Sequence, residues 1–314
     1  MTAVTRIVGF VVGLVVVFAL ALGLGRVVGP VGEPAAAHAG SADAHGDADR
    51  SAAAADLPGG LLVSDAGHTL RLSSPTAPAG QDVPVTFTVT GPDGTAVSDY
   101  EVEHEKELHL IAVRRDLTGY QHVHPTLAAD GTWTTALDLE PGTWRLFADF
   151  TASGADPLTL GTDLTVPGTA ALAAPVPETR TVTVDGYTVT VTGDLVAGQD
   201  AALTLSVSKD GRPVTDLQPY LGAYGHLVAL REGDLAYLHV HPDGEPGDGR
   251  TQPGPDVVFH TSVPSAGAYR LYLDFQHDGV VRTAPLAVTA TASDHPAAAT
   301  PRSSSTTSDH GDDH

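Results

Sequence analysis

Two sets of three histidines in this sequence have spacings suited to ligands of one metal ion. The first set is His109, His122 and His124, and the second is His226, His239 and His241. In both sets the second histidine follows the first by 13 positions and the third follows by 2, within His-Val-His-Pro. Imidazole nitrogen is a favoured ligand of Cu(II), Zn(II) and Ni(II). The pattern therefore predicts a nitrogen-rich metal site in each copy.

The composition narrows the choice of metal. The sequence has no cysteine, and its single methionine is Met1. A thiolate site, a cysteine nucleophile and a thioether-rich Cu(I) site are therefore excluded. We expect Cu(II) or Zn(II) as the bound ion. A structural role for histidines packed in a hairpin without metal is the alternative.

The second set of histidines lies on a predicted β-hairpin, which supports the prediction of a shared site. A turn at Gly233-Asp234 separates two apolar stretches that are typical of strands. Counting back from this turn places His226 opposite His241, and Val228 opposite His239. Residues two apart on a strand share a face, so the three imidazoles should project from one side of the hairpin.

The same count applies to the first copy. It places His109 opposite His124, and His122 opposite Ile111. Pro125 and Pro242 are expected to end their strands and to leave the last histidine at a sheet edge. Three imidazoles on one face of one hairpin are within reach of one ion.

A fourth ligand is left open by the sequence. Asp149 and Asp274 occupy equivalent positions in the two copies, each four residues after an arginine, Arg145 and Arg270. Either carboxylate could bind the ion, but we expect both to pair with these arginines instead. The unmatched histidines, His68, His104, His260 and His277, are expected at the surface or at a pocket edge, or to act in one copy alone.

The histidine sets lie within two internal repeats. Ala79–Asp82 recurs as Ala197–Asp200, and Gly142–Phe150 recurs as Gly267–Phe275 with conservative changes. Short stretches alternate apolar and polar residues, and turn-forming Asp-Gly and Pro-Gly pairs separate them. We therefore predict an all-β chain of two tandem immunoglobulin-like β-sandwich domains.

The N-terminus carries an apolar run without charge over residues 7–25, long enough to span a bilayer. We interpret it as a signal anchor, with a cleaved signal peptide as the alternative. Either places the repeats outside the cytoplasm, membrane-anchored or secreted. The predicted segments are the anchor or signal peptide (1–29), a flexible linker (30–58), repeat 1 (59–167), a linker (168–178), repeat 2 (179–290) and a disordered tail (291–314).

Charge and motif content restrict the partners. The formal net charge of −22 disfavours binding to nucleic acid. No catalytic Ser/His/Asp order, activated nucleophile or cofactor motif is present, so we expect no enzymatic activity. The expected partners are a metal ion, the cell membrane through the N-terminal helix, and an envelope or metal-transport protein.

The runs around the histidines also carry a resemblance. Residues 107–125, 222–242 and 269–283 are similar to those of secreted or membrane-anchored actinobacterial proteins of uncharacterised function. The repeats resemble extracytoplasmic copper-carrier sandwiches more loosely, which implies copper handling.

Two functions from different classes thus follow. The first is a metal-binding protein that sequesters or delivers Cu(II) or Zn(II). The second is a cell-envelope interaction module without metal.

Overall fold

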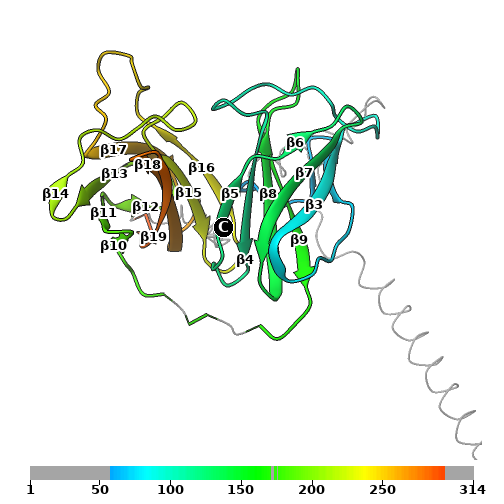
Figure 1. Cartoon of the computed structure of the whole chain (residues 1–314), viewed down its shortest axis with the longest axis horizontal. Helices are drawn as coiled ribbons and strands as arrows, with labels where there is room; N and C mark the ends of the chain where they lie inside the picture. The colour runs from blue at the N-terminus through cyan, green and yellow to red at the C-terminus, as the bar shows by residue number, and fades with distance from the viewer. Residues whose placement is uncertain (1–56, 171–172, 175, 294–314) are drawn as a thin grey trace, which may run out of the picture. The chain divides into compact units, whose positions relative to one another are not determined.

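The computed structural model describes residues 57–170, 173–174 and 176–293, and every regular element in them is a β-strand (Figure 1). This confirms the predicted all-β class. The expected anchor or signal peptide lies outside the described residues, as do nearly all of the first linker and of the tail. The described residues contain no helix able to cross a membrane.

The strands fall into two groups along the chain. Repeat 1 holds β1 (Ser64–Asp65), β2 (His68–Leu72), β3 (Gly80–Thr90), β4 (Leu108–Arg114), β5 (Gln121–Val123), β6 (Thr126–Leu127), β7 (Thr132–Leu139), β8 (Gly142–Phe150) and β9 (Leu158–Val166). Repeat 2 holds β10 (Thr181–Val184), β11 (Tyr187–Thr192), β12 (Leu195–Val196), β13 (Asp200–Lys209), β14 (Arg212–Pro213), β15 (His226–Arg231), β16 (Tyr237–Pro242), β17 (Asp256–Ser262), β18 (Gly267–His277) and β19 (Val280–Thr291). Both groups belong to one compact unit.

Repeat 1 is a sandwich of two sheets. One sheet has the strand order β1-β2-β3-β7-β6, and the other has the order β5-β4-β8-β9. Strand β3 shows why these residues form such a layer, because Val83, Val85, Phe87 and Val89 are buried while the residues between them are not. The sheet that contains β4 and β5 carries the first histidine set.

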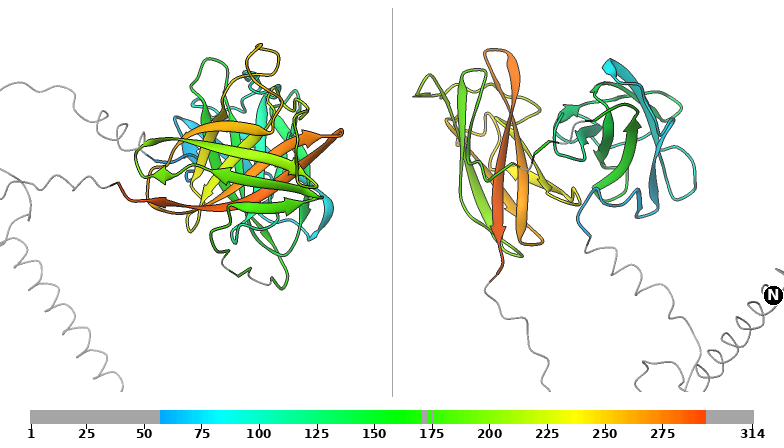
Figure 2. Two further views of the ribbon diagram at one scale, coloured as in Figure 1. Left: turned by 90° about the vertical axis from the view of Figure 1, so that its left-hand side faces the viewer. Right: turned by 90° about the horizontal axis from the view of Figure 1, so that it is seen from below.

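Repeat 2 differs because one strand joins its two layers. Strand β16 pairs with β15 through residues 237–240 and with β17 through His241 and Pro242, which makes one continuous sheet. Figure 2 shows this repeat in two further views. Pro242 ends β16 as expected, but His241 pairs with His260 of β17 and so lies inside the sheet. The expectation of a sheet edge at His241 is therefore wrong.

The hairpin registers match the sequence count. Val228 pairs with His239 in repeat 2, and Ile111 pairs with His122 in repeat 1. The turn in repeat 2 is closed by a hydrogen bond from the Arg231 amide to the Ala236 carbonyl. These two predicted pairings are thus confirmed, whereas the predicted pairs His226–His241 and His109–His124 lie just beyond the paired residues of their hairpins.

Strand β4 is buried on both faces. Leu108, Leu110 and Ala112 point into the core of repeat 1, and the alternate residues Ile111 and Val113 belong to a different cluster. Strand β15 repeats this division, because its alternate residues are shared between the core of repeat 2 and the same second cluster. The histidine-bearing face of each hairpin is therefore covered, rather than exposed to solvent.

The second cluster is built from both repeats, and we call it the inter-repeat core. Its buried members are Ile111, Val113, Leu117 and Phe147 from repeat 1 and Val228, Leu230, Leu235, Tyr237 and Tyr272 from repeat 2. The partly buried Tyr120 stacks on Tyr272 with ring centroids 4.0 Å apart, and Tyr237 packs on Phe147 at 5.5 Å. Each fully buried side chain of this kind contributes about 1.5–3 kcal/mol. The inter-repeat core therefore holds the two histidine faces together.

The chain entering repeat 1 adds backbone contacts to both repeats. The Tyr237 amide donates to the Gly59 carbonyl, and the Gly60 amide donates to the Thr159 carbonyl. A side chain at Gly161 would overlap the Gly60 carbonyl and the Arg145 guanidinium, so this approach depends on glycine.

The burial of both faces of β4 gives a test of the inter-repeat core. Ile111→Ala and Leu110→Ala should each lower the free energy of unfolding by about 2–5 kcal/mol, because both side chains are buried. Thr134→Ala, on the exposed face of β7, is the control and should change it by less than about 0.5 kcal/mol. Urea denaturation measures all three. If Ile111→Ala behaved like the control, this face would be exposed and the repeats would not pack.

Candidate metal centre

The hairpin of β4 and β5 brings together all three histidines of the first set. One ring nitrogen from each of His109, His122 and His124 lies within 4.8 Å of the other two. His109 lies on β4, His122 on β5, and His124 directly after β5. This arrangement follows from the register, in which His122 pairs with Ile111, two residues from His109. The cluster can supply three neutral nitrogen ligands.

The backbone fixes the tautomer of His109. Its Nε2–H donates to the Glu103 carbonyl at 3.1 Å, and a carbonyl can only accept. The neutral ring therefore has its lone pair on Nδ1. That nitrogen faces His122 Nε2 at 3.0 Å.

His122 is fixed in the complementary way. Its Nδ1–H donates to Asp274 Oδ2 at 2.9 Å, which leaves the lone pair of the neutral ring on Nε2. Two lone pairs then face each other across 3.0 Å. The contact is favourable only if a proton or a cation lies between the rings. Two nitrogens bound to one ion at about 2.1 Å are roughly 3.0–3.4 Å apart for bond angles from 90° to tetrahedral, so the spacing fits a metal.

His124 completes the group. Its Nε2 is buried and has no hydrogen-bond partner within the described part of the chain. Its ring centroid lies 5.0 Å from that of His109 and 4.9 Å from that of His122. A buried ring nitrogen without a partner costs free energy unless something binds it. His124 thus offers a third ring nitrogen as a ligand for the same ion.

Burial also keeps two of these rings neutral. It lowers the pKa of His109 to about 4, with a further contribution from the charge of His122. Burial likewise lowers the pKa of His124 to about 3, helped by His122 and His109. Metal ligands must be deprotonated. Neither ring has to release a proton to bind a cation at neutral pH.

The second histidine set is described in part. His226 Nε2–H donates to the Tyr220 carbonyl at 2.8 Å, as His109 does to Glu103 six residues before it. Burial lowers the pKa of His226 to about 4. The backbones of His239 and His241 follow β16, but their side chains lie outside the described residues. The second metal site therefore remains a prediction.

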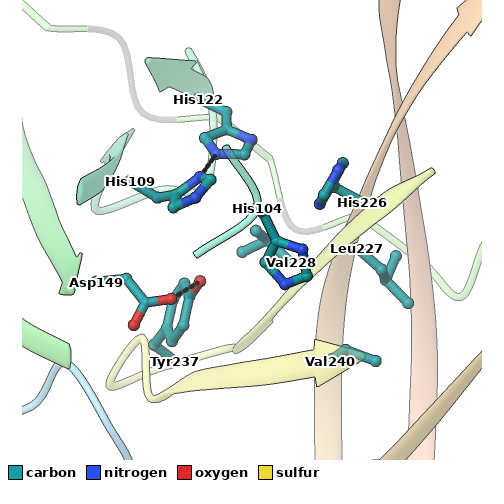
Figure 3. Close-up of a pocket in the computed structure, with 9 residues that line it drawn as sticks. All are labelled: His104, His109, His122, Asp149, His226, Leu227, Val228, Tyr237 and Val240. Carbon is teal, nitrogen blue, oxygen red and sulfur yellow. Dashed lines mark hydrogen bonds between the residues drawn. The ribbon is translucent and has the colours of Figure 1, made fainter. Parts of the chain in front are cut away.

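A small cavity lies beside the first cluster. Its volume is ≈ 30 Å³, about the space of one water molecule, and Figure 3 shows the side chains around it. His109, His122 and Asp149 line it from repeat 1, and His226 and Tyr237 line it from repeat 2. An ion held by three histidines would therefore have room for one further small ligand.

The two aspartates have partners other than those expected. Arg145 pairs with Asp163 at 3.1 Å and Arg270 with Glu232 at 3.4 Å. Asp149 instead accepts a hydrogen bond from Tyr237 of repeat 2 at 3.1 Å, and Asp274 accepts one from His122 of repeat 1. Each aspartate thus reaches a residue of the other repeat. Each also accepts one from a threonine on the next strand, Thr159 or Thr283.

The reach of Asp274 to His122 was not predictable from either repeat alone. One feature could have indicated it. Asp274 pairs with His226 on the neighbouring strand, and the equivalent Asp149 pairs with His109 in the same way. These pairings put a carboxylate on the histidine face of each sheet.

The unmatched histidines lie in different environments. His104 borders the cavity, in keeping with a pocket-edge position, and its ring centroid is 5.3 Å from that of His226. His260 is exposed on β17, and His68 is buried but borders a second cavity, as a pocket-edge position requires. His277 is buried. His277 contacts the Tyr187 hydroxyl at 2.7 Å and Asp216 at 3.0 Å.

Comparison with solved structures finds similar β-rich chains. They include the Escherichia coli adhesin FdeC (17% identity, 73% of this chain and 65% of that one, TM-score 0.25) and the Yersinia pseudotuberculosis adhesin InvE (14%, 71% and 59%, 0.21). Domains 4–9 of the surface layer protein SbsC are also similar (12%, 72% and 31%, 0.23). This chain spans less than two thirds of the length of each. We draw no functional conclusion from similarity at this level.

A search of curated proteins finds no significant match. A family model described as "Domain of unknown function (DUF8832)" matches residues 63–167 and again residues 182–292. The two matches follow the two repeats and cover more than half of the chain, so the protein belongs to this family and carries two copies of its domain.

Proposed function

We propose that this protein is an extracytoplasmic metal-binding module that holds Cu(II) or Zn(II) through His109, His122 and His124. The observation that carries the proposal is the 3.0 Å approach of His109 Nδ1 to His122 Nε2. The outer nitrogen of each ring already donates to an oxygen, so both inner nitrogens present lone pairs. The buried, unpartnered His124 Nε2 points to the same conclusion.

The hydrogen bonds on the far side of the rings also match those usual for metal-bound histidines. Histidine ligands of metals usually donate their second N–H to a carboxylate or a backbone carbonyl. His122 donates to a carboxylate and His109 to a carbonyl. Such partners fix the ring orientation and make the ligating nitrogen more basic.

The three imidazole ligands indicate which ion would bind and what role the site would serve. Three imidazoles without thiolate follow the usual order of affinities, in which Cu(II) binds more tightly than Zn(II). Three protein ligands also leave a coordination position open, and the adjacent cavity has room for a small ligand there. A centre of this kind suits the sequestration or delivery of an ion.

A second candidate is a cell-envelope interaction module without metal. The observation that favours it is the packing of the histidine faces against the inter-repeat core, where histidines could serve as buried polar contacts. The adhesin and surface layer structures share the β-rich architecture at TM-scores too low to decide between the candidates. The two candidates differ in whether a chelator changes the stability of the protein.

Metal titration separates the candidates. The protein should bind Cu(II) or Zn(II) at the first cluster, and His109→Ala or His122→Ala should weaken that binding at least tenfold because each removes a ligand. His260→Ala is the matched control, since His260 is an exposed histidine outside the cluster. Isothermal titration with a competing chelator measures the affinities. Equal affinity in all variants, with no effect of chelator on stability, would favour the interaction module.

The metal-free protein should lose stability in mildly acidic solution. The pKa of His109 is about 4 in the fold and near 6.5 when unfolded, so the unfolded state binds the proton first as pH falls. The stabilisation is therefore present above about pH 6.5 and is lost between about pH 6.5 and 4. The free energy of unfolding, from urea denaturation in chelator, should fall less over this range for His109→Gln than for the unsubstituted protein, by on the order of 1–3 kcal/mol. Parallel curves for both proteins would contradict the burial of a neutral ring.

A further inference from the structure

We propose that Asp274 of repeat 2 is the positioning residue for the metal centre of repeat 1, so that this centre is complete only when the two repeats are docked. The inference rests on the proposed function and adds how that site is regulated. Asp274 touches no ion in this scheme. It acts through His122, the ring that it orients.

Asp274 is held as an orienting group has to be. Its residue surface is 2% exposed, and it lies on β18. Thr283 donates to Oδ1 at 2.5 Å, and His122 Nδ1–H donates to Oδ2 at 2.9 Å. With both oxygens engaged, the carboxylate cannot rotate away from His122 without losing a hydrogen bond. It therefore keeps Nε2 of His122 as the nitrogen that carries the lone pair.

The position of Asp274 ties this orientation to docking. Its own sheet places it beside His226, its register partner on β15, whereas His122 belongs to the other repeat. The 2.9 Å contact therefore crosses the boundary between the repeats, next to the Tyr120–Tyr272 stack. If the repeats part, His122 loses its carboxylate, and its ring can rotate or take the other tautomer.

Linkage makes this dependence reciprocal. If docking raises the affinity of the centre for a metal, the bound metal stabilises docking by the same factor. Metal binding would then be felt at the inter-repeat core, beyond the three ligands. A purely structural role for Asp274, as a hydrogen-bond partner that contributes only to stability, would instead leave the affinity for the metal unchanged.

The experiment compares Asp274→Asn with Asp216→Asn in the full chain. Asp216 is the matched control, because it pairs with a buried histidine, His277, at 3.0 Å within repeat 2. We expect Asp274→Asn to weaken Zn(II) and Cu(II) binding about 10–100-fold, and Asp216→Asn to change it less than about twofold. The Cu(II) spectrum should shift in Asp274→Asn alone, a change that a merely structural role would not produce.

Thr283→Val keeps the test decisive if Asp274→Asn does not fold. It removes the donor to Oδ1 with little change of shape, and should weaken metal binding several-fold. Unchanged affinity and spectrum in both variants, with the wild-type protein binding metal, would overturn the role of Asp274 and leave the proposed function standing. A wild-type protein that binds neither ion would overturn both.

Discussion

The packing of two histidine-bearing sheet faces against each other is the constraint on which the rest of this structure depends. Both β4 and β15 supply apolar side chains to two cores at once, and each carries one histidine at or next to its first residue, His109 or His226. Covering these faces removes the imidazoles from water. Burial then lowers the pKa of His109 and leaves His124 Nε2 without a hydrogen-bond partner among the described residues.

The sequence predicts the local parts of this arrangement well. The alternation of residues and the turn residues are local properties, and they predict the all-β class and the hairpin registers of Ile111 and Val228. The convergence of the three histidines follows from that register alone. Hairpin geometry is therefore enough to find the first cluster, and repetition of the spacing adds weight.

The sequence does not predict what covers the cluster. The residue pattern of each repeat predicts its own strands and turns. It does not predict which surface of one repeat packs against the other. One signal was available, because Leu108–Val113 is apolar at every position but His109, which is typical of strands buried on both faces. The partners of Asp149 and Asp274 were misassigned for the same reason. Nearby arginines were visible in the sequence, whereas Tyr237 and His122 came from the other repeat.

The contacts across the inter-repeat core are related as they would be by a two-fold axis between the repeats. Tyr120 and Tyr237 occupy equivalent positions, and each packs on the equivalent ring of the other repeat, Tyr272 or Phe147. Self-complementary contacts of this kind are those of a symmetric homodimer. The chain is thus equivalent to a dimer fused head to tail, in which the linker sets a fixed effective concentration. The two halves are not identical, since His104 of repeat 1 and Leu221 of repeat 2 occupy one equivalent turn position.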